Sequence, residues 1–297
     1  MAKCFEQGED KMKIYSTDCL TGMKNLADNS VDFICTDLPY GVMNYDADKK
    51  INLAEMWQEF RRILKPCCVV ALFASSRFTF ELAASNMDWY KYKWVWVKNF
   101  ATLFIHAKNR PLSKYEEILI FSNGKIQHAG KSNCRMKYNP QGLKSATIIK
   151  ANGDGTICLR NCKHKGDDRK RFGGVYHKSP FNVKYREQEA TNYPSDVLYF
   201  NAPHNMNRNH PNEKPVDLLE YLIKTYSNEG ETVLDCTMGS GSCGVACVNT
   251  NREFIGYELN KKYYDVASER IIKAMENKYR EEKAKALFET GNAFLID

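Results

Sequence analysis

Three closely spaced glycines and an acidic residue form the strongest chemical pattern in the sequence. Thr232-Val-Leu-Asp235 is predicted to be a strand, and Gly239-Ser-Gly241-Ser-Cys-Gly244 follows it as a turn that leads into a helix. The next predicted strand ends at Glu258. Glycines let the backbone approach a ligand closely, and an acid at the tip of the second strand can accept both hydroxyls of a ribose. The pattern predicts a nucleoside-containing cofactor and leaves open a dinucleotide or S-adenosylmethionine, because enzymes of both kinds share this turn.

A second polar turn lies near the amino terminus. Thr36-Asp37-Leu38-Pro39-Tyr40-Gly41 directly follows Val31–Cys35, which is predicted to be a short buried strand. Open α/β sheets bind ligands at the carboxyl ends of their strands, so this turn and the glycine turn are predicted to face one crevice. A nicotinamide-dependent oxidoreductase would use the glycine turn but would leave Asp37 to Tyr40 without a role, which disfavours that class.

The elements that must position these turns alternate between strand and helix. This alternation predicts an α/β fold with a mainly parallel sheet covered by helices on both faces. Pro66 is expected to stop the first long helix. The predicted strands are 31–35, 69–74, 94–97, 118–121, 232–234 and 253–257, and the predicted helices are 53–64, 78–84, 216–223, 245–249 and about 261–287.

Composition sets the class of protein. The chain has 297 residues, 43% of them hydrophobic and 27% charged, which fits a globular protein with one main domain and an insertion. No run of residues is long and apolar enough to span a membrane, and the start is too charged for a secretory signal, so an intracellular protein is expected. The eleven cysteines are expected to be reduced thiols, and no metal site is predicted.

Positive charge is concentrated in the middle of the chain. Residues 1–125 carry 17 basic and 15 acidic side chains, residues 126–196 carry 14 and 6, and residues 197–297 carry 12 and 15. The middle segment also loses periodicity and gains glycine and asparagine, so it is predicted to be an inserted, loop-rich module. Two interpretations of this charge stay open. The segment could be a surface that contacts phosphates and stacks on bases, or it could be a solvated basic loop region. Its aromatic residues include Tyr138, Phe172, Tyr176, Phe181, Tyr185 and Tyr193.

Four segments resemble one enzyme family. Asp37-Leu38-Pro39-Tyr40 resembles the Asp-Pro-Pro-Tyr signature of S-adenosylmethionine-dependent DNA amino-methyltransferases, and Ile14 to Leu20 resembles the segment before it. His210-Pro-Asn-Glu-Lys214-Pro215 resembles the element that precedes the cofactor turn of this family, and Asp235 to Ser242 resembles the turn. The order, with the catalytic signature first and the cofactor turn last, is that of the beta group. The resemblance covers nearly the whole chain except about 126–196.

The resemblance implies a Rossmann-like methyltransferase fold that is circularly permuted. Residues 1–125 would form the catalytic half, 126–196 a target-recognition insertion, and 197–297 the cofactor-binding half. The substrate would be double-stranded DNA, with methyl transfer from S-adenosylmethionine to the N6 amine of a flipped-out adenine in a restriction-modification setting. The cytoplasm of a bacterial or phage-infected cell would be its location, and a homodimer is left open.

Site residues follow from the same resemblance. The catalytic set is Asp37, Leu38, Pro39 and Tyr40. The Asp37 carboxylate and the carbonyl of residue 38 would accept the two amino hydrogens, and Tyr40 would stack on the base. Glu258 would bind the ribose, Asp18 the adenine amino group, and Lys214 with the turn the methionine end. The cofactor set is Asp18, Cys19, Lys214, Asp235, Thr237, Gly239, Ser240, Gly241, Ser242 and Glu258. The DNA-binding set is Lys163, Lys165, Arg169, Lys170 and Arg171.

The sequence departs from the family pattern at three positions. Leu38 replaces the first proline of the signature but keeps the carbonyl. Cys236 and Thr237 stand where the family commonly has proline and phenylalanine, so an aromatic contact with the cofactor is expected to be missing. The leading Asp37, in place of serine, favours adenine N6 over cytosine N4. Cytosine N4, an RNA target and a non-catalytic DNA-binding relic stay open as alternatives.

Overall fold

The computed structural model describes residues 3–4, 11–41, 50–126, 134–145, 148–151, 157–159, 190–203 and 212–289. The chain forms two compact units, Met1–Asn139 with Asp196–Asp297 and Pro140–Ser195. The first stretch of the predicted insertion, 126–139, belongs to the larger unit, and the roles assigned to the three segments stay predictions. The five predicted DNA-binding cations, Lys163 to Arg171, lie outside the described residues.

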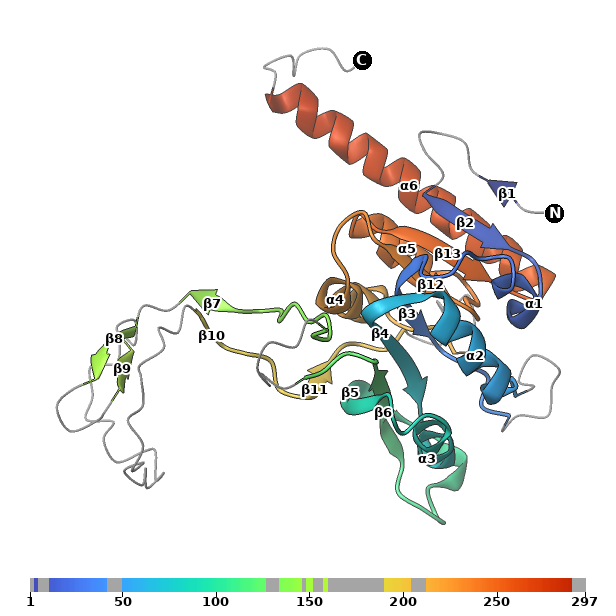
Figure 1. Cartoon of the computed structure of the whole chain (residues 1–297), viewed down its shortest axis with the longest axis horizontal. Helices are drawn as coiled ribbons and strands as arrows, with labels where there is room; N and C mark the ends of the chain where they lie inside the picture. Colours follow the sequence, from blue (N-terminus) through green and yellow to red (C-terminus); the bar gives the residue numbers. More distant parts are fainter. Residues whose placement is uncertain are drawn as a thin grey trace. The chain divides into compact units, whose positions relative to one another are not determined.

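A nine-stranded sheet forms the centre of the larger unit (Figure 1). Five of the eight neighbouring strand pairs are parallel, and the strand Ser113–Phe121 runs antiparallel to both of its neighbours. In spatial order the strands are β1 (Lys3–Cys4), β2 (Met12–Tyr15), β13 (Glu253–Tyr257), β12 (Thr232–Asp235), β3 (Val31–Thr36), β4 (Leu64–Ala74), β6 (Ser113–Phe121), β5 (Tyr90–Thr102) and β11 (Val197–Tyr199). The mainly parallel sheet expected from the sequence is confirmed.

Helices cover both faces of the sheet, as the figure shows (Figure 1). Adjacent residues of β4 pack into opposite cores: Val69 joins the core under the helices of 216–289, whereas Val70 joins the core under the helices of 19–85. A strand that is buried on both faces is made mostly of apolar residues, which is why β3 and β4 could be predicted from the sequence. The helices are α1 (Cys19–Met23), α2 (Leu53–Ile63), α3 (Ser76–Ser85), α4 (Val216–Tyr226), α5 (Ser242–Asn249) and α6 (Lys261–Glu289), with a short 3₁₀ turn η2 (Phe104–His106).

The smaller unit contains two short antiparallel ribbons among its described residues. The first pairs β7 (Lys144–Ser145) with β10 (Ala190–Thr191), and the second pairs β8 (Ile148–Ala151) with β9 (Ile157–Leu159). The sequence predicts a loop-rich module here, and none of these four strands is among the predicted ones.

Two expectations about local structure are wrong. Pro66 does not stop α2, which ends at Ile63, because β4 begins at once and Pro66 lies inside it. The pairing register of β3 with β4 shifts between Val31 and Phe33, so Pro66 falls in an irregular stretch where its missing N–H is tolerated. The cysteines are not all free thiols, because Cys67 and Cys134 form a disulfide across 67 residues of sequence. Six other cysteines in the described ranges are free and buried.

No helix within the described residues is both long enough and apolar enough to span a bilayer. The same residues contain no cluster of three His, Cys, Asp or Glu side chains arranged to hold a metal ion.

Candidate active site

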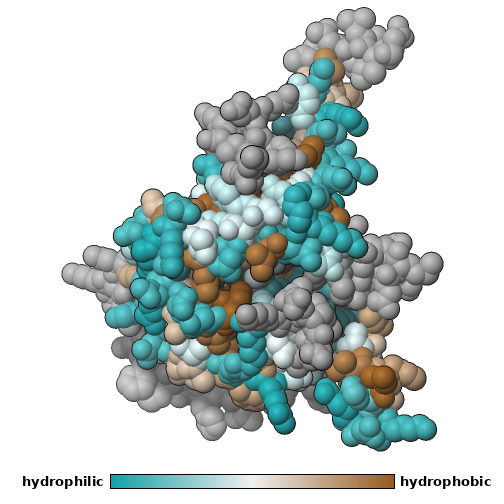
Figure 2. Space-filling view, turned by 90° about the vertical axis from the view of Figure 1, so that its right-hand side faces the viewer, coloured by the Kyte–Doolittle hydropathy of each residue, from teal (hydrophilic) through white to brown (hydrophobic). Residues whose placement is uncertain are grey.

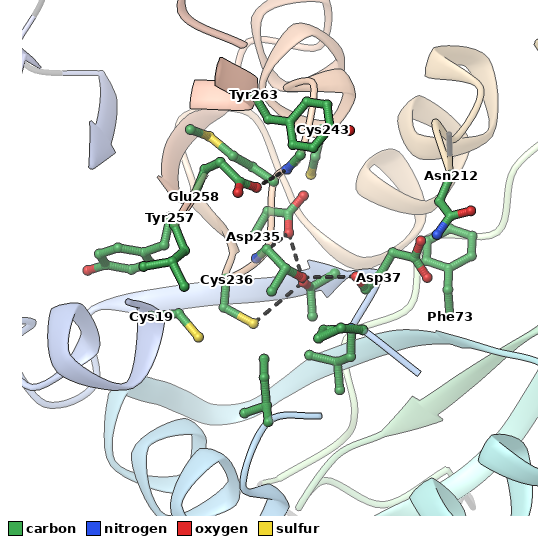
Figure 3. A pocket seen from close by; sticks show the side chains of 18 of the residues that line it. Cys19, Asp37, Phe73, Asn212, Asp235, Cys236, Cys243, Tyr257, Glu258 and Tyr263 are labelled. Atoms are coloured by element: carbon green, nitrogen blue, oxygen red, sulfur yellow. Dashed lines mark hydrogen bonds between the residues drawn. The ribbon is translucent and has the colours of Figure 1, made fainter. Parts of the chain in front are cut away.

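A cavity of about 590 Å³ opens where β3, β12 and β13 end. Asp37 lies in its wall together with Gly239 and Glu258, so the two predicted turns do face one crevice (Figure 3). Of the predicted catalytic and cofactor residues, those in the wall are Asp18, Cys19, Asp37, Leu38, Pro39, Lys214, Asp235, Thr237, Gly239, Ser240, Ser242 and Glu258. Tyr40 and Gly241 do not line it.

The glycine turn has a backbone that only glycine adopts easily. Gly239 and Gly241 have φ values of 52° and 78°, in the left-handed region. A Cβ on Gly241 would lie 2.9 Å from the backbone of Ala267 in α6, so a larger residue would push the turn and the helix apart. The turn is held from behind by Arg270, which donates to the carbonyl and hydroxyl oxygens of Ser240 at 2.7 and 2.8 Å.

Glu258 lies beside this turn at the end of β13. Its carboxylate accepts the N–H of Gly239 at 3.0 Å and the N–H of Asn260 at 2.7 Å. Burial raises the pKa of Glu258, while these backbone donors oppose the shift. Two backbone donors orient the carboxylate toward the cavity, where it is an acceptor of the kind that binds vicinal hydroxyls.

A chain of hydroxyl groups connects the cofactor turn to the catalytic turn. Thr36 Oγ1 donates to Asp235 Oδ1 at 2.7 Å and lies 2.8 Å from Thr237 Oγ1. Thr237 Oγ1 donates to the backbone carbonyl of Asp37 at 3.0 Å (Figure 3). From the sequence, Thr237 is a predicted cofactor residue that replaces an aromatic side chain of the family; in the structure its hydroxyl also contacts the catalytic turn directly.

Asp235 is buried beneath both turns. Burial raises the pKa of Asp235 to about 7, against the opposing effect of its hydrogen bonds from the Thr36 hydroxyl and the Thr237 N–H. The folded state therefore binds more protons than the unfolded state between the ordinary carboxyl pKa of 3.8 and about 7, and the stability of the protein falls as the pH rises through that window.

Replacing Asp235 by asparagine is expected to remove this pH dependence while keeping an oxygen acceptor for Thr36 and Thr237. The free energy of unfolding of the variant, relative to the unaltered protein, should rise with pH by up to about 1.4 kcal/mol per pH unit below neutrality and level off above it. Urea denaturation at a series of pH values measures the difference. A difference that stays constant from pH 5 to 8 would contradict the assigned protonation.

Four charged side chains, of which Lys214 is buried and the others are partly buried, form a network at the catalytic turn. Lys214 Nζ contacts the Asp37 carboxylate and lies 3.5 Å from Glu116 Oε2. Glu116 Oε1 in turn accepts from Lys98 Nζ at 2.5 Å. The sequence assigned Lys214 to the methionine end of the cofactor, and that role stays a prediction. Lys214 lines the cavity, but its ammonium group is paired with Asp37.

The charges of this network determine the protonation of Asp37. Burial raises the pKa of Asp37 above its ordinary value, and the Lys214 ammonium group opposes the rise. Lys214 and Lys98 hold the pKa of Glu116 below its ordinary value despite burial. The Lys214 side chain is 9% exposed and has little contact with water, so its charge depends on the two carboxylates.

The side chains next to Asp37 are fixed by packing. The Tyr40 hydroxyl donates to Asp37 Oδ1 at 3.0 Å, and its ring stacks on Phe78 of α3 with centroids 4.8 Å apart. The predicted stacking of Tyr40 on a base stays a prediction. Leu38 is 2% exposed and packs into the core under α2 and α3, so an apolar anchor stands where the family has a proline.

Asp18 and Cys19 lie at the start of α1. Asp18 is the N-cap of this helix and accepts the N–H of Thr21 at 2.9 Å, and Cys19 is buried. Ser242 is the first residue of α5, and its hydroxyl lies 3.4 Å from Glu213 Oε1. Their predicted contacts with the cofactor are compatible with these positions and stay predictions.

A mainly parallel sheet that brings a glycine turn, Glu258 and the start of the Asp-Leu-Pro-Tyr turn to one cavity is the arrangement expected of an amino-methyltransferase. The family model described as DNA methylase matches residues 31–269. The chain therefore belongs to this family, which confirms the family expected from the sequence.

Individual proteins that are similar to this chain are also DNA methyltransferases by name. Type II methyltransferase M.HpaI of Haemophilus parainfluenzae is 26% identical over 87% of this chain and 74% of its own length. DNA adenine methyltransferase YhdJ of Escherichia coli K12 is 26% identical over 89% and 84%. The solved M1.HpyAVI–SAM complex is 25% identical, with a TM-score of 0.53 over 87% of this chain and 99% of that one. The cytosine-N4-specific PvuII DNA methyltransferase, 13% identical with a TM-score of 0.55 over 88% and 86%, shares the fold.

Proposed function

We propose that this chain transfers the methyl group of S-adenosylmethionine to the exocyclic N6 amine of an adenine flipped out of double-stranded DNA. The observation that carries the proposal is the position of the Asp37 carboxylate in the same cavity wall as Gly239 and Glu258. The membership of the chain in the DNA methylase family supports the reaction class. The similarity to a protein named as a DNA adenine methyltransferase supports the target.

The cavity residues fit the proposed cofactor. The turn at Gly239 and Gly241 lets a ligand approach the backbone, and Glu258 offers oriented oxygens to a ribose. Asp18, Lys214 and the remaining predicted cofactor residues would hold the adenine and methionine ends. When bound, S-adenosylmethionine supplies an electrophilic methyl group on a sulfonium.

The residues of the catalytic turn would prepare the amine. The lone pair of an exocyclic amine is delocalised into the ring and is a poor nucleophile. The Asp37 carboxylate would accept one amino hydrogen and the Leu38 carbonyl the other, which draws the nitrogen toward tetrahedral geometry with its lone pair directed at the methyl group. Alignment of the reacting groups is worth up to roughly 7 to 11 kcal/mol. After transfer the surplus amino proton would pass toward Asp37 and solvent.

Thr237 would act as a positioning residue for this carbonyl pair. Its hydroxyl holds the Asp37 carbonyl and therefore the orientation of the peptide that leads to Leu38. Thr237→Val removes the hydrogen bond with little change in shape and is expected to lower kcat about tenfold, because one hydrogen bond contributes about 0.5 to 1.5 kcal/mol. Steady-state kinetics should show little change in KM for S-adenosylmethionine, and Thr237→Ser should restore kcat. An unaltered kcat in the valine variant would show that Thr237 does not position the catalytic turn.

Several finer features belong to the same proposal. The basic segment 126–196, with Lys163, Lys165, Arg169, Lys170 and Arg171, would recognise the DNA target, and its excess of basic over acidic residues supports this. The chain would act in the cytoplasm of a bacterial or phage-infected cell, which contains DNA. A homodimer would bring a second copy of that basic segment to the duplex.

Analysis of the methylated nucleoside tests the proposed reaction. Unmethylated plasmid DNA is incubated with the protein and S-adenosylmethionine labelled on its methyl group, digested, and examined by mass spectrometry. N6-methyl-2′-deoxyadenosine carrying the label is the expected product. Labelled N4-methyl-2′-deoxycytidine would instead identify cytosine as the target base, and the absence of label in DNA would reject the proposal.

A further inference from the structure

The connection between β5 and β6 lies at the catalytic edge of the sheet. Because β6 is antiparallel to both β4 and β5, β5 ends at the same edge as β3 and β4. Asp37 follows the end of β3, so residues 103–112 project from the edge that carries it. The base of this connection is tied to the catalytic turn, since Lys98 of β5 pairs with Glu116 of β6 and Glu116 with Lys214.

This connection has a definite shape. Leu103 adopts a left-handed conformation with φ of 66°, and the 3₁₀ turn η2 follows it. The N–H groups of Asn109 and Arg110 donate to the carbonyl of His106 at 2.8 and 3.0 Å. Thr102 and Ser113 still pair across the base of the hairpin. These contacts give the backbone of the tip, residues 103–114, a defined course.

The tip exposes large apolar side chains to water. Leu103, Phe104 and Ile105 are 43%, 77% and 88% exposed. The hairpin is the lowest part of the larger unit in Figure 1, and Figure 2, turned about the vertical axis, shows apolar next to hydrophilic side chains at the lower end of that face. Three consecutive exposed apolar residues are costly in water and mark a surface that a partner covers.

The charges around these apolar residues have one sign. Lys108, Arg110 and Lys114 are exposed, and the sequence from 99 to 115 contains no aspartate or glutamate. Within the described parts of the chain, none of these three cations forms an ion pair with a carboxylate. The tip is therefore apolar at its centre and positive around it, which suits a polyanion that also offers flat apolar surfaces.

We infer that the β5–β6 tip is a second DNA-binding element, in which Lys108, Arg110 and Lys114 contact phosphates and Phe104 and Ile105 pack against bases beside the flipped-out nucleotide. The inference rests on the proposed function and extends DNA contact beyond residues 126–196. Apolar side chains inserted at a base step are a known way to stabilise distorted DNA. A symmetric contact between two copies of the tip would bring like charges together, which disfavours a second copy as the occupant.

Removal of the three positive charges tests the phosphate contacts. The variant Lys108→Gln/Arg110→Gln/Lys114→Gln is compared with the unaltered protein for binding to a mixed-sequence duplex over a range of salt concentrations. Each phosphate contact contributes about 0.9 to the slope of log K against log salt, so the slope should become shallower by about 2 to 3. The matched control is Lys273→Gln/Arg280→Gln/Lys283→Gln on the exposed face of α6, for which the slope should stay the same. Both variants should bind S-adenosylmethionine normally, which verifies folding.

Removal of the apolar side chains tests the base contacts separately. Phe104→Ser/Ile105→Ser should lower methyl transfer to unmethylated plasmid DNA at least about tenfold while leaving the salt slope unchanged, because a base contact is lost and no phosphate contact is. Phe288→Ser, which alters a phenylalanine of similar exposure near the end of α6, is the control and should transfer normally.

The outcomes separate this inference from the proposed function. Tip variants with the salt slope and transfer rate of the unaltered protein would overturn the inference and leave the function standing. Tip variants that only change the oligomeric state, measured by sedimentation, would also overturn it by making the tip a contact between copies. Failure of the unaltered protein to bind or methylate DNA would overturn both.

Discussion

Replacing Asp37 by alanine is expected to lower the rate of methyl transfer by about a thousandfold or more. The variant loses the carboxylate that accepts an amino hydrogen, and a preorganised hydrogen-bonding partner of a reacting group is worth about a hundred- to a thousandfold in rate. General acid–base assistance from the same carboxylate adds to this loss. Single-turnover measurements with labelled S-adenosylmethionine and plasmid DNA would determine the rate.

Cofactor binding should survive the same substitution. The Glu258 carboxylate accepts hydrogen bonds from the backbone N–H groups of Gly239 and Asn260, and Arg270 donates to the glycine turn. None of these hydrogen bonds involves Asp37. The affinity for S-adenosylmethionine, measured by calorimetry, should therefore change only a few-fold. Asp37→Asn is the matched variant of equal size, and it should also be inactive because the charge is lost. Turnover of the alanine variant at the rate of the unaltered protein would refute the role of Asp37.

Replacing Lys214 by methionine is expected to destabilise the protein strongly. Lys214 is 9% exposed and is the cation that Asp37 and Glu116 share. Removing one partner of a buried ion pair leaves an uncompensated charge and typically costs about 3 to 5 kcal/mol. The loss applies where the carboxylates are ionised, and it shrinks as the pH falls through the raised pKa of Asp37, because a neutral carboxyl needs no counter-ion. Urea denaturation at several pH values measures it.

The same substitution should shift the pH dependence of activity. Lys214 lowers the pKa of Asp37, so its removal raises that pKa further and makes the carboxylate scarcer at neutral pH. The acid limb of the profile of kcat against pH should move to higher pH. In Lys214→Met/Glu116→Gln the second carboxylate is neutralised, so part of the stability should return. A methionine variant with unchanged stability and profile would show that the network has no such role.

Much of the fold could be predicted from the sequence because its central strands are buried on both faces. Apolar residues predominate in β3, β4, β12 and β13, and 69–74 of β4 is an unbroken apolar run; α2 and α4 show helical spacing. β2, β11 and α1 are too short to carry a periodic signal. Pro66 misled the prediction, since only the paired register reveals the irregular stretch that accommodates it.

The two turns of the candidate site could be predicted from the sequence, but the side-chain contacts that connect them could not. The carboxyl ends of parallel strands meet at one edge, so Asp37 and Glu258 could be placed together from the sequence. The contact of Thr36 with Asp235 spans 199 positions, and Glu116 lies 98 positions from Lys214, so neither pairing has a local signal. The cysteine pair Cys67 and Cys134 is hidden for the same reason.

A crystal structure of the chain with S-adenosylhomocysteine tests most directly whether the two turns build one reaction centre. We expect the ribose hydroxyls to bind Glu258, the backbone of Gly239 to Gly241 to contact the ligand, and its sulfur to face Asp37 across open space wide enough for an amine. A ligand bound elsewhere, or one whose sulfur points away from Asp37, would show that the two turns do not form one reaction centre.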